Sequence, residues 1–172
     1  MTDFQVAYKQ PATLDGPLWD AFGCLMKLAQ DGASRLEVRE QIETLEAEMM
    51  KLPQVEQPLE HLFTDGLYGR RILNPQGSLL VTKIHKEPNF SFILSGRLGV
   101  ISENGFEIFE GPRMFITKPG TKRVLYAQTD VVFITVHPNP QNVQDLEVLE
   151  DRIIAKSFDE IEIQAENIME LR

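Results

Sequence analysis

Apolar residues recur at helical spacing in the first part of the chain. Between Leu18 and Ala29 they are separated by 4, 3 and 4 residues, which predicts an amphipathic helix. Asp15 precedes a glycine and a proline, so we expect it to cap the start of this helix. Gly32 is expected to end it, because glycine readily adopts the left-handed conformation found after a helix.

A second helix is predicted directly after the first. Ser34 and the glutamate three residues later form a capping-box pattern, and Pro53 ends the segment. The apolar positions form a two-heptad seam, at Val38, Ile42, Leu45, Met49 and Leu52. Isolated helices of this length are marginal in water, so the seam needs a partner. That partner is the first helix, the strand-rich middle of the chain, or a second copy.

The pattern changes to short apolar segments after residue 60. Turn-forming residues punctuate the chain from Asp65-Gly66 to Pro119-Gly120 at intervals of roughly ten positions. The predicted strands cover residues 68–73, 79–85, 90–94, 98–102, 106–109, 114–118, 123–127 and 131–137. Asn104-Gly105 gives the clearest hairpin signal. Eight short strands without intervening helices predict a mainly β fold, a sandwich or barrel, and jelly rolls join eight strands in this way.

These patterns predict one domain in three parts. A chain of 172 residues fits a single core with appendages. We expect a helical arm at 1–58, a β-barrel at 59–140 and an acidic C-terminal extension at 141–172. The extension is expected to contain a helix near 145–151 and a returning strand within 152–158, and to pack back on the rest of the protein.

Charge and composition narrow the classes of function. The net charge is −9, but residues 61–140 carry 9 basic against 6 acidic residues, while both flanking parts are acidic. Nucleic-acid binding is not expected without a broad basic surface, whereas a small anion fits a mildly basic centre. The single cysteine, Cys24, excludes an internal disulfide, suits a reducing compartment and is expected to be buried. The sequence has neither a long apolar segment nor an apolar leader, so no membrane association or secretion is expected.

Four segments carry a family resemblance. They are Lys83-Ile-His85, the strand from Asn89 to Gly96, Gly120-Thr-Lys-Arg123 and Thr135-Val-His137. They resemble the motifs of metal-binding cupins, His-x-His-x3-Glu, a strand ending in Leu-x-Gly, and a Pro-Gly-Thr-x-His-like turn. In that alignment the four ligand positions hold Lys83, His85, Asn89 and Arg123. With Leu52-Pro-Gln54, the segments are similar to small cupin-like proteins encoded by tailed bacteriophages and prophages. The resemblance implies a single cupin-type jelly-roll barrel and a phage origin, but no reaction.

The four residues fit an anion pocket better than a metal site. Lys83 and His85 lie two apart on one strand, so both face the same side, the barrel interior in the cupin register. Arg123 cannot ligate a metal, but its planar guanidinium suits a carboxylate or phosphate. Asn89 offers only an amide oxygen to a metal, so no metal and no cofactor are expected.

Two other interpretations of this cluster stay open. The cationic residues could be neutralised by ordinary ion pairs with Glu87, Glu110 or Asp130 at the barrel mouth. A metal site could also be built on His85 with His137 and Glu87 recruited, which would make the protein a metal-dependent oxygenase or isomerase.

No catalytic residue is assigned, because the sequence lacks a nucleophile elbow, a phosphate-binding loop and a Cys-x-x-Cys pair. We expect a non-enzymatic binding or assembly module that holds a small anion. A homo-oligomer is expected, a dimer first, through the arm or the barrel sheets. A phage or host protein is a further partner, and the host cytoplasm or the virion is the expected location.

Overall fold

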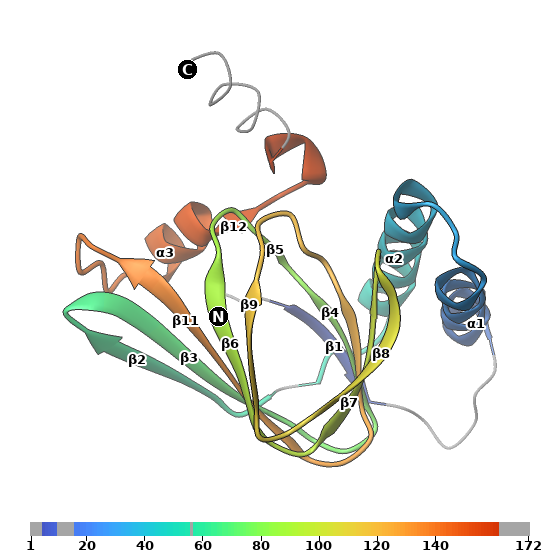
Figure 1. Ribbon diagram of the computed structural model, residues 1–172, viewed down its shortest axis with the longest axis horizontal. Coiled ribbons are helices and arrows are strands. Elements are labelled where there is room, and N and C mark those ends of the chain that lie inside the picture. The colour runs from blue at the N-terminus through green and yellow to red at the C-terminus, as the bar shows by residue number, and fades with distance from the viewer. Residues whose placement is uncertain (1–4, 10–15, 56, 162–172) are drawn as a thin grey trace.

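The computed structural model describes residues 5–9, 16–55 and 57–161. Two five-stranded sheets form its centre (Figure 1). In both sheets every strand pairs antiparallel to its neighbours. The first sheet contains, in spatial order, β1 (Gln5–Lys9), β4 (Ser78–Thr82), β10 (Val124–Ala127), β7 (Arg97–Ser102) and β8 (Gly105–Glu110). The second sheet contains β2 (Leu59–Thr64), β3 (Gly66–Asn74), β11 (Val131–Asn139), β6 (Asn89–Ser95) and β9 (Arg113–Thr117). A third, short pairing joins β5 (Ile84–His85) to β12 (Ile154–Ala155).

The strand order is that of a jelly roll. Among the eight strands β3, β4 and β6 to β11, every connection except the β7–β8 hairpin crosses from one sheet to the other. The fold is therefore the predicted mainly β, cupin-type jelly roll, and the eight predicted strands are all present. The hairpin at Asn104-Gly105 is confirmed, with Ser102 paired to Gly105 and a φ of 105° at Gly105.

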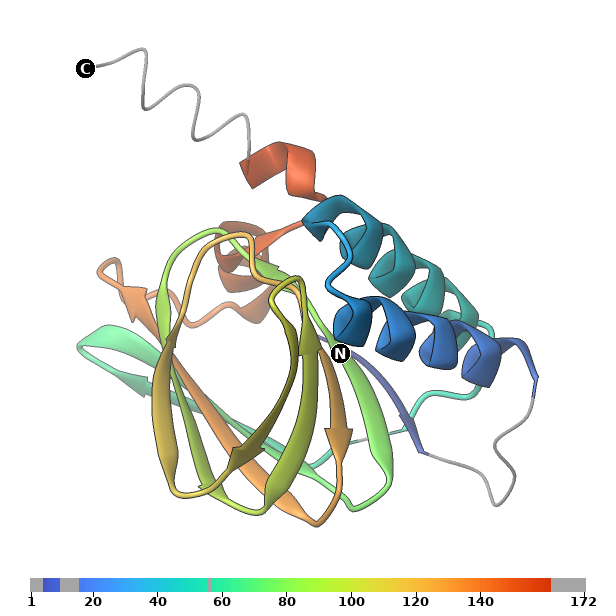
Figure 2. The same ribbon diagram turned by 45° about the vertical axis from the view of Figure 1, so that its right-hand side comes forward.

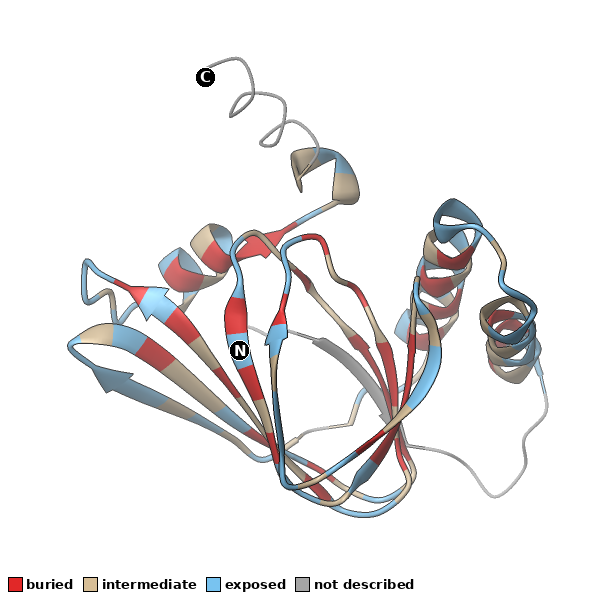
Figure 3. Cartoon of the chain, in the orientation of Figure 1, coloured by how far each residue is buried: buried red, intermediate tan, exposed pale blue. Residues whose placement is uncertain are grey.

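Strand alternation gives the first sheet two buried faces. Leu80 of β4 and Leu125 of β10 point into the barrel core, whereas Leu79 and Val124 of the same strands belong to a separate core on the outside. Figure 3 shows the resulting buried positions on these strands and on the facing helices. Both faces of this sheet are therefore covered, and the helices supply the outer cover.

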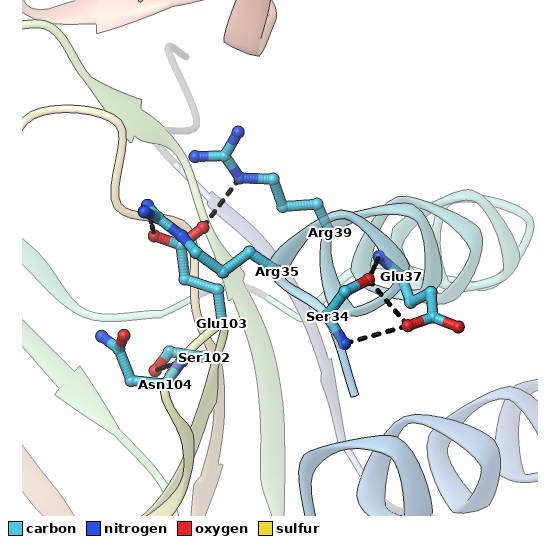
Figure 4. Close-up of polar contacts among 7 residues, drawn as sticks. All are labelled: Ser34, Arg35, Glu37, Arg39, Ser102, Glu103 and Asn104. Atoms are coloured by element: carbon cyan, nitrogen blue, oxygen red, sulfur yellow. Dashed lines mark hydrogen bonds and ion pairs between the residues drawn. The ribbon is translucent and has the colours of Figure 1, made fainter. Parts of the chain in front are cut away.

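The two helices are α1 (Pro17–Asp31) and α2 (Arg35–Met50). Gly16, not Asp15, occupies the N-cap of α1, with Pro17 in the first turn, and Asp15 itself lies outside the described residues. Gly32 ends α1 with a φ of 72°, as predicted. The predicted capping box of α2 is confirmed, because Glu37 N donates to Ser34 Oγ at 3.3 Å and Ser34 N donates to Glu37 Oε2 at 2.9 Å (Figure 4).

The heptad seam of α2 packs against other parts of the same chain. Val38, Ile42, Leu45 and Met49 are at most 1% exposed and pack with α1 and the outer face of the first sheet (Figure 2). The seam is therefore unavailable to a second copy, which leaves the barrel sheets as the candidate interface for the predicted homo-oligomer. The arm predicted at 1–58 is also not wholly helical, because β1 adds a strand to the first sheet by pairing with β4.

Glu103, in the β7–β8 turn, ties the barrel to α2. Its carboxylate pairs with Arg35 and accepts a hydrogen bond from Arg39 Nε at 2.8 Å (Figure 4). Charge-assisted contacts of this kind fix orientation as well as adding stability. The helical pair is thus held against the barrel by a polar contact beside its apolar core.

The C-terminal extension packs back on the barrel, as predicted. Asp145 caps α3 (Leu146–Ile153) by accepting from Glu147 N at 2.9 Å, and β12 follows directly. Leu149, Ile153 and Ile154 form a core with Tyr68 of β3. β12 pairs with β5, opposite His85, so the extension covers the barrel at the end where the candidate site lies. Residues 162–172, predicted as a helical tail, lie outside the described residues.

Two smaller features complete the fold. Cys24 is exposed on α1, contrary to the expectation of a buried thiol, because its side of the helix faces away from the sheet. Among the helices of the described residues, none is both long and apolar enough to cross a bilayer.

Candidate functional site

The inward-facing residues of the barrel lie in layers set by the strand register. Nearest the extension, Tyr68 is opposite His137 and Asn89 is opposite Thr117. The next layer holds Arg70 opposite Thr135, which in turn faces Ser91. Below it, Ile72 is opposite Phe133. The interior therefore changes from imidazole and amide groups, through a polar layer, to an apolar floor.

A small cavity lies between these layers. Water-molecule centres can reach about 40 Å³ of it. Its lining includes three cationic side chains, Arg70, Lys83 and Arg123, together with His85 and several hydroxyl groups. None of the described residues that line it is an aspartate or glutamate. The cavity is therefore electropositive and open to small molecules only.

Arg123, which precedes β10, is a partly buried cation that lines the cavity. Its Nη1 donates to Thr117 Oγ1 at 3.1 Å, and its guanidinium lies 5.4 Å from the centre of the Phe115 ring. Among the described residues no carboxylate forms an ion pair with it. Burial lowers the pKa of Arg123 below the ordinary arginine value, and the attraction of the Glu107 carboxylate opposes this shift in part.

Asn89 ends a hydrogen-bonded chain that starts at Arg123. Thr117 Oγ1 lies 2.8 Å from Ser91 Oγ, which donates to Asn89 Oδ1 at 3.1 Å. Asn89 is 3% exposed, and its Nδ2 has no partner among the described residues. The Nδ1 atom of His85 is likewise buried without a partner. Buried polar atoms are normally satisfied, so two such atoms near a buried cation point to a missing ligand.

Lys83 lines the cavity, but its charge is also paired with a carboxylate. Its side chain borders the cavity, but its Nζ lies 3.5 Å from Glu46 Oε1 of α2, and Glu46 also pairs with Lys122. The ion-pair interpretation thus holds for Lys83, although the partner is Glu46. The three acids suggested by the sequence, Glu87, Glu110 and Asp130, are all exposed.

The rings of all three histidines and of Tyr68 stack in one row. His85 stacks on His137 with ring centres 5.1 Å apart, and Tyr68 follows at 5.9 Å. The Tyr68 hydroxyl lies 2.8 Å from His61 Nδ1 at the far end. Burial lowers the pKa of His85 to about 3, helped by His137 and the two arginines. Burial and Arg70 lower that of His137 to about 4. Both rings are therefore neutral at pH 7.

These low histidine pKa values predict acid sensitivity. In the unfolded chain both histidines take up a proton near pH 6.5, whereas the folded protein binds it only near pH 4 and 3. Stability is therefore fully present above pH 6.5. It is expected to fall by up to about 1.4 kcal/mol per pH unit per histidine as the pH drops toward 5. Urea unfolding at pH 7.5, 6 and 5 measures this slope, which His137→Asn should reduce. A free energy of unfolding that is constant over this range would contradict the pKa values.

The donor set does not fit the metal that the cupin motifs imply. Among the described residues no group of three histidine, cysteine, aspartate or glutamate side chains comes together. His85 and His137 are neighbours, but their rings are nearly parallel, at 22°, so their nitrogens do not converge. Glu87, the suggested third ligand, is exposed. Arginine and lysine, at two of the four motif positions, do not provide the missing ligands.

The structure adds residues that sequence reasoning missed. Arg70 lines the same cavity, and its charge lowers the pKa of His61, His85 and His137. Ser91 and Thr117 connect Arg123 to Asn89. Strand alternation could have placed Ser91 on the face of Asn89, since the two lie two residues apart on one strand. No sequence signal distinguishes Arg70 from its exposed neighbour in β3, because the facing strands decide which one points inward.

No protein-family model matches the chain, and no curated protein matches its sequence. Among solved structures it is similar to an acetylacetone dioxygenase from Acinetobacter johnsonii, with 16% identity and a TM-score of 0.41, over 46% of this chain and 58% of that chain. It is also similar to an RmlC-like cupin from Methanocaldococcus jannaschii, with 14% identity and a TM-score of 0.43, over 50% and 84% of the two chains. The EutQ protein of Clostridium difficile gives 14% identity and a TM-score of 0.41, over 49% and 68%.

By its strand order this chain is a cupin-type jelly roll. It spans a little over half the length of the dioxygenase. The likeness to these proteins is one of fold alone, and dioxygenase activity is a property of that neighbour.

Proposed function

We propose that this protein is a non-enzymatic binding module that holds a small anion inside the barrel. Arg123 carries this proposal: it is a partly buried guanidinium that forms no ion pair with a carboxylate of the described residues, and it lies at the end of a chain of hydrogen bonds that leads to Asn89. A charge taken out of water is costly, and Glu107 offsets this cost only in part, so a bound anion would offset more of it. Ser91 and Thr117, which line the cavity between Arg123 and Asn89, supply hydroxyl groups for the anion.

The wider role follows from the sequence resemblance. The motifs that resemble phage-encoded cupin-like proteins support a module produced in a bacterial host cytoplasm. There it would serve as an accessory virion or assembly factor, or would sequester a small anionic host metabolite. A metal-dependent enzyme is disfavoured by the donor set, in which only His85 and His137 are adjacent imidazoles.

Mass spectrometry of small molecules released from the purified, folded protein tests this proposal. We expect an organic anion in stoichiometric amount from the wild type, and its loss from Arg123→Met. Methionine keeps the length and apolar stem of the side chain but removes the guanidinium. An anion retained by Arg123→Met, or no anion bound by wild-type protein even when supplied at millimolar concentration, would refute the proposal.

We also propose that the protein is a homodimer and that the outer face of the second sheet is the interface. This face is not covered by α1 or α2, and Phe90 of β6 pairs across to Ile116 of β9 there. Phe90, Met114 and Ile116 are 49%, 64% and 59% exposed. Contiguous exposed apolar residues of this kind mark interaction surfaces.

Light scattering tests the dimer. Ile116→Lys is expected to give a monomer, because a charge on this face must be desolvated in the interface. Leu36→Lys is the matched control, since Leu36 is 63% exposed on α2, away from the second sheet, and this variant should stay dimeric. A monomeric wild type would refute the dimer, and a dimeric Ile116→Lys variant would place the interface elsewhere.

A further inference from the structure

The layered interior also limits the chemical class of the anion, given the proposed function. One side of the cavity is polar, with Arg123, Ser91 and Thr117. The opposite side has three apolar residues, Ile72, Leu125 and Phe133, of which Leu125 and Phe133 pack in the barrel core. Its one polar residue, Asn74, accepts a hydrogen bond from Gln57 at its Oδ1. The two kinds of lining come from different layers of the same strands. Arg70 and Ile72 are two residues apart on β3, and Arg123 and Leu125 are two apart at the start of β10.

An anion with oxygens on every side does not match this lining. Phosphate and sulfate are tetrahedral, so one or more of their oxygens would face the floor formed by Ile72, Leu125 and Phe133. A polar atom buried without a hydrogen-bond partner costs free energy. A carboxylate confines its two oxygens to one end and matches the planar fork of an arginine. Its carbon chain can then lie on the apolar floor.

The size of the cavity limits the length of that chain. A single water molecule needs about 10–15 Å³ of the space that its centre can occupy. The cavity offers about 40 Å³ by this measure, and it is enclosed by residues of both sheets. It can therefore hold a ligand about as large as three or four water molecules. That is the size of a carboxylate with a tail of one to three carbons, and a long-chain or aromatic acid exceeds it.

We infer that the barrel binds a short-chain aliphatic monocarboxylate, with its carboxylate at Arg123 and Thr117 and its tail on the floor formed by Ile72, Leu125 and Phe133. The neutral His85, whose Nδ1 is buried without a partner, lies at the carboxylate end and provides one further polar contact. Within this class each added methylene is expected to increase affinity about fourfold, until the floor is reached.

Isothermal titration of the intact protein with formate, acetate, propionate, butyrate, hexanoate, phosphate and sulfate tests the inference. The buffer should contain chloride as its only small anion. We expect affinity to rise from formate to propionate, to fall by hexanoate, and to be at least about tenfold weaker for phosphate and sulfate than for propionate.

Substitutions in the apolar floor give a second test that does not depend on the order of affinities measured for the wild type. Phe133→Leu enlarges the apolar end, so the preferred acid should become longer by one or two carbons. Leu125→Val is a second, milder enlargement in case the first variant does not fold, and circular dichroism reports folding. Leu73→Val is the matched control, because Leu73 follows Ile72 on β3 but is 36% exposed, and it should leave the length preference unchanged.

The outcomes separate this inference from the proposed function. Phosphate or sulfate binding more tightly than every carboxylate, in an Arg123-dependent way, would overturn the monocarboxylate inference and keep the anion-binding function. A length preference that neither floor variant shifts would also overturn it. Failure of every anion to bind the wild type would refute the proposed function itself.

Discussion

Arg123→Met is expected to weaken propionate binding at least about 30-fold, because removing one member of a buried, hydrogen-bonded charge pair costs about 2 kcal/mol or more. Arg123 is the partly buried cation that donates to Thr117, the first residue of the polar chain that leads to Asn89, so its loss removes both the charge and a hydrogen-bond donor. Isothermal titration at constant salt measures the change in Kd.

Arg97→Met provides the matched control for this measurement. Arg97 lies at the start of β7, is exposed and does not line the cavity, so the same substitution there should change Kd less than about twofold. Equal effects of the two substitutions would show that the anion responds to the overall charge of the protein. The cavity would then not be the binding site.

Leu45→Ala is expected to lower the free energy of unfolding by about 2–5 kcal/mol. Leu45 is 0% exposed in the core between α2, α1 and the outer face of the first sheet. Leu36→Ala on the same helix is the control, because Leu36 is 63% exposed and its truncation should change stability by less than about 0.5 kcal/mol. Urea denaturation measures both, and equal effects would mean that the helices do not depend on the barrel for their stability.

The barrel could be predicted from sequence because its signals are local. A turn about every ten residues and β-forming segments between the turns determine the strands. Asn104-Gly105 even located the β7–β8 hairpin. The short pairings that complete the fold were less visible. β12 consists of Ile154 and Ala155 and is stabilised by β5, a partner about 70 residues away, so no local pattern marks its exact bounds.

The heptad seam shows the limit of what residue spacing can predict. Its spacing correctly marked Val38, Ile42, Leu45 and Met49 as buried. The same spacing is compatible with a second helix, a sheet or another copy of the chain, because each offers an apolar surface. Outward-facing residues of the first sheet, such as Leu79 and Val124, supplied the partner. The spacing therefore could not choose among the three partners.

The candidate site could be predicted from the sequence only in part. Alternation along a strand correctly placed His85 beside the cavity, and the motif alignment brought Arg123 and Asn89 near it. The partner of Lys83 could not be predicted in this way, because its long side chain reaches past its own strand and pairs with Glu46 on α2. Side-chain partners that come from distant elements decide which charges are neutralised. That distinction separates Lys83 from Arg123.

Under the proposed function, Arg123 is kept in the barrel for a ligand rather than for stability. Its lowered pKa means that burial costs the guanidinium charge more than the attraction of Glu107 returns when no anion is bound. The most direct test compares thermal unfolding of the wild type and Arg123→Met in chloride buffer, without and with saturating propionate. We predict that Arg123→Met has the higher Tm without propionate, and that propionate raises the Tm of the wild type alone. A lower Tm for Arg123→Met under both conditions, with no effect of propionate on the wild type, would contradict the claim and make Arg123 a structural residue.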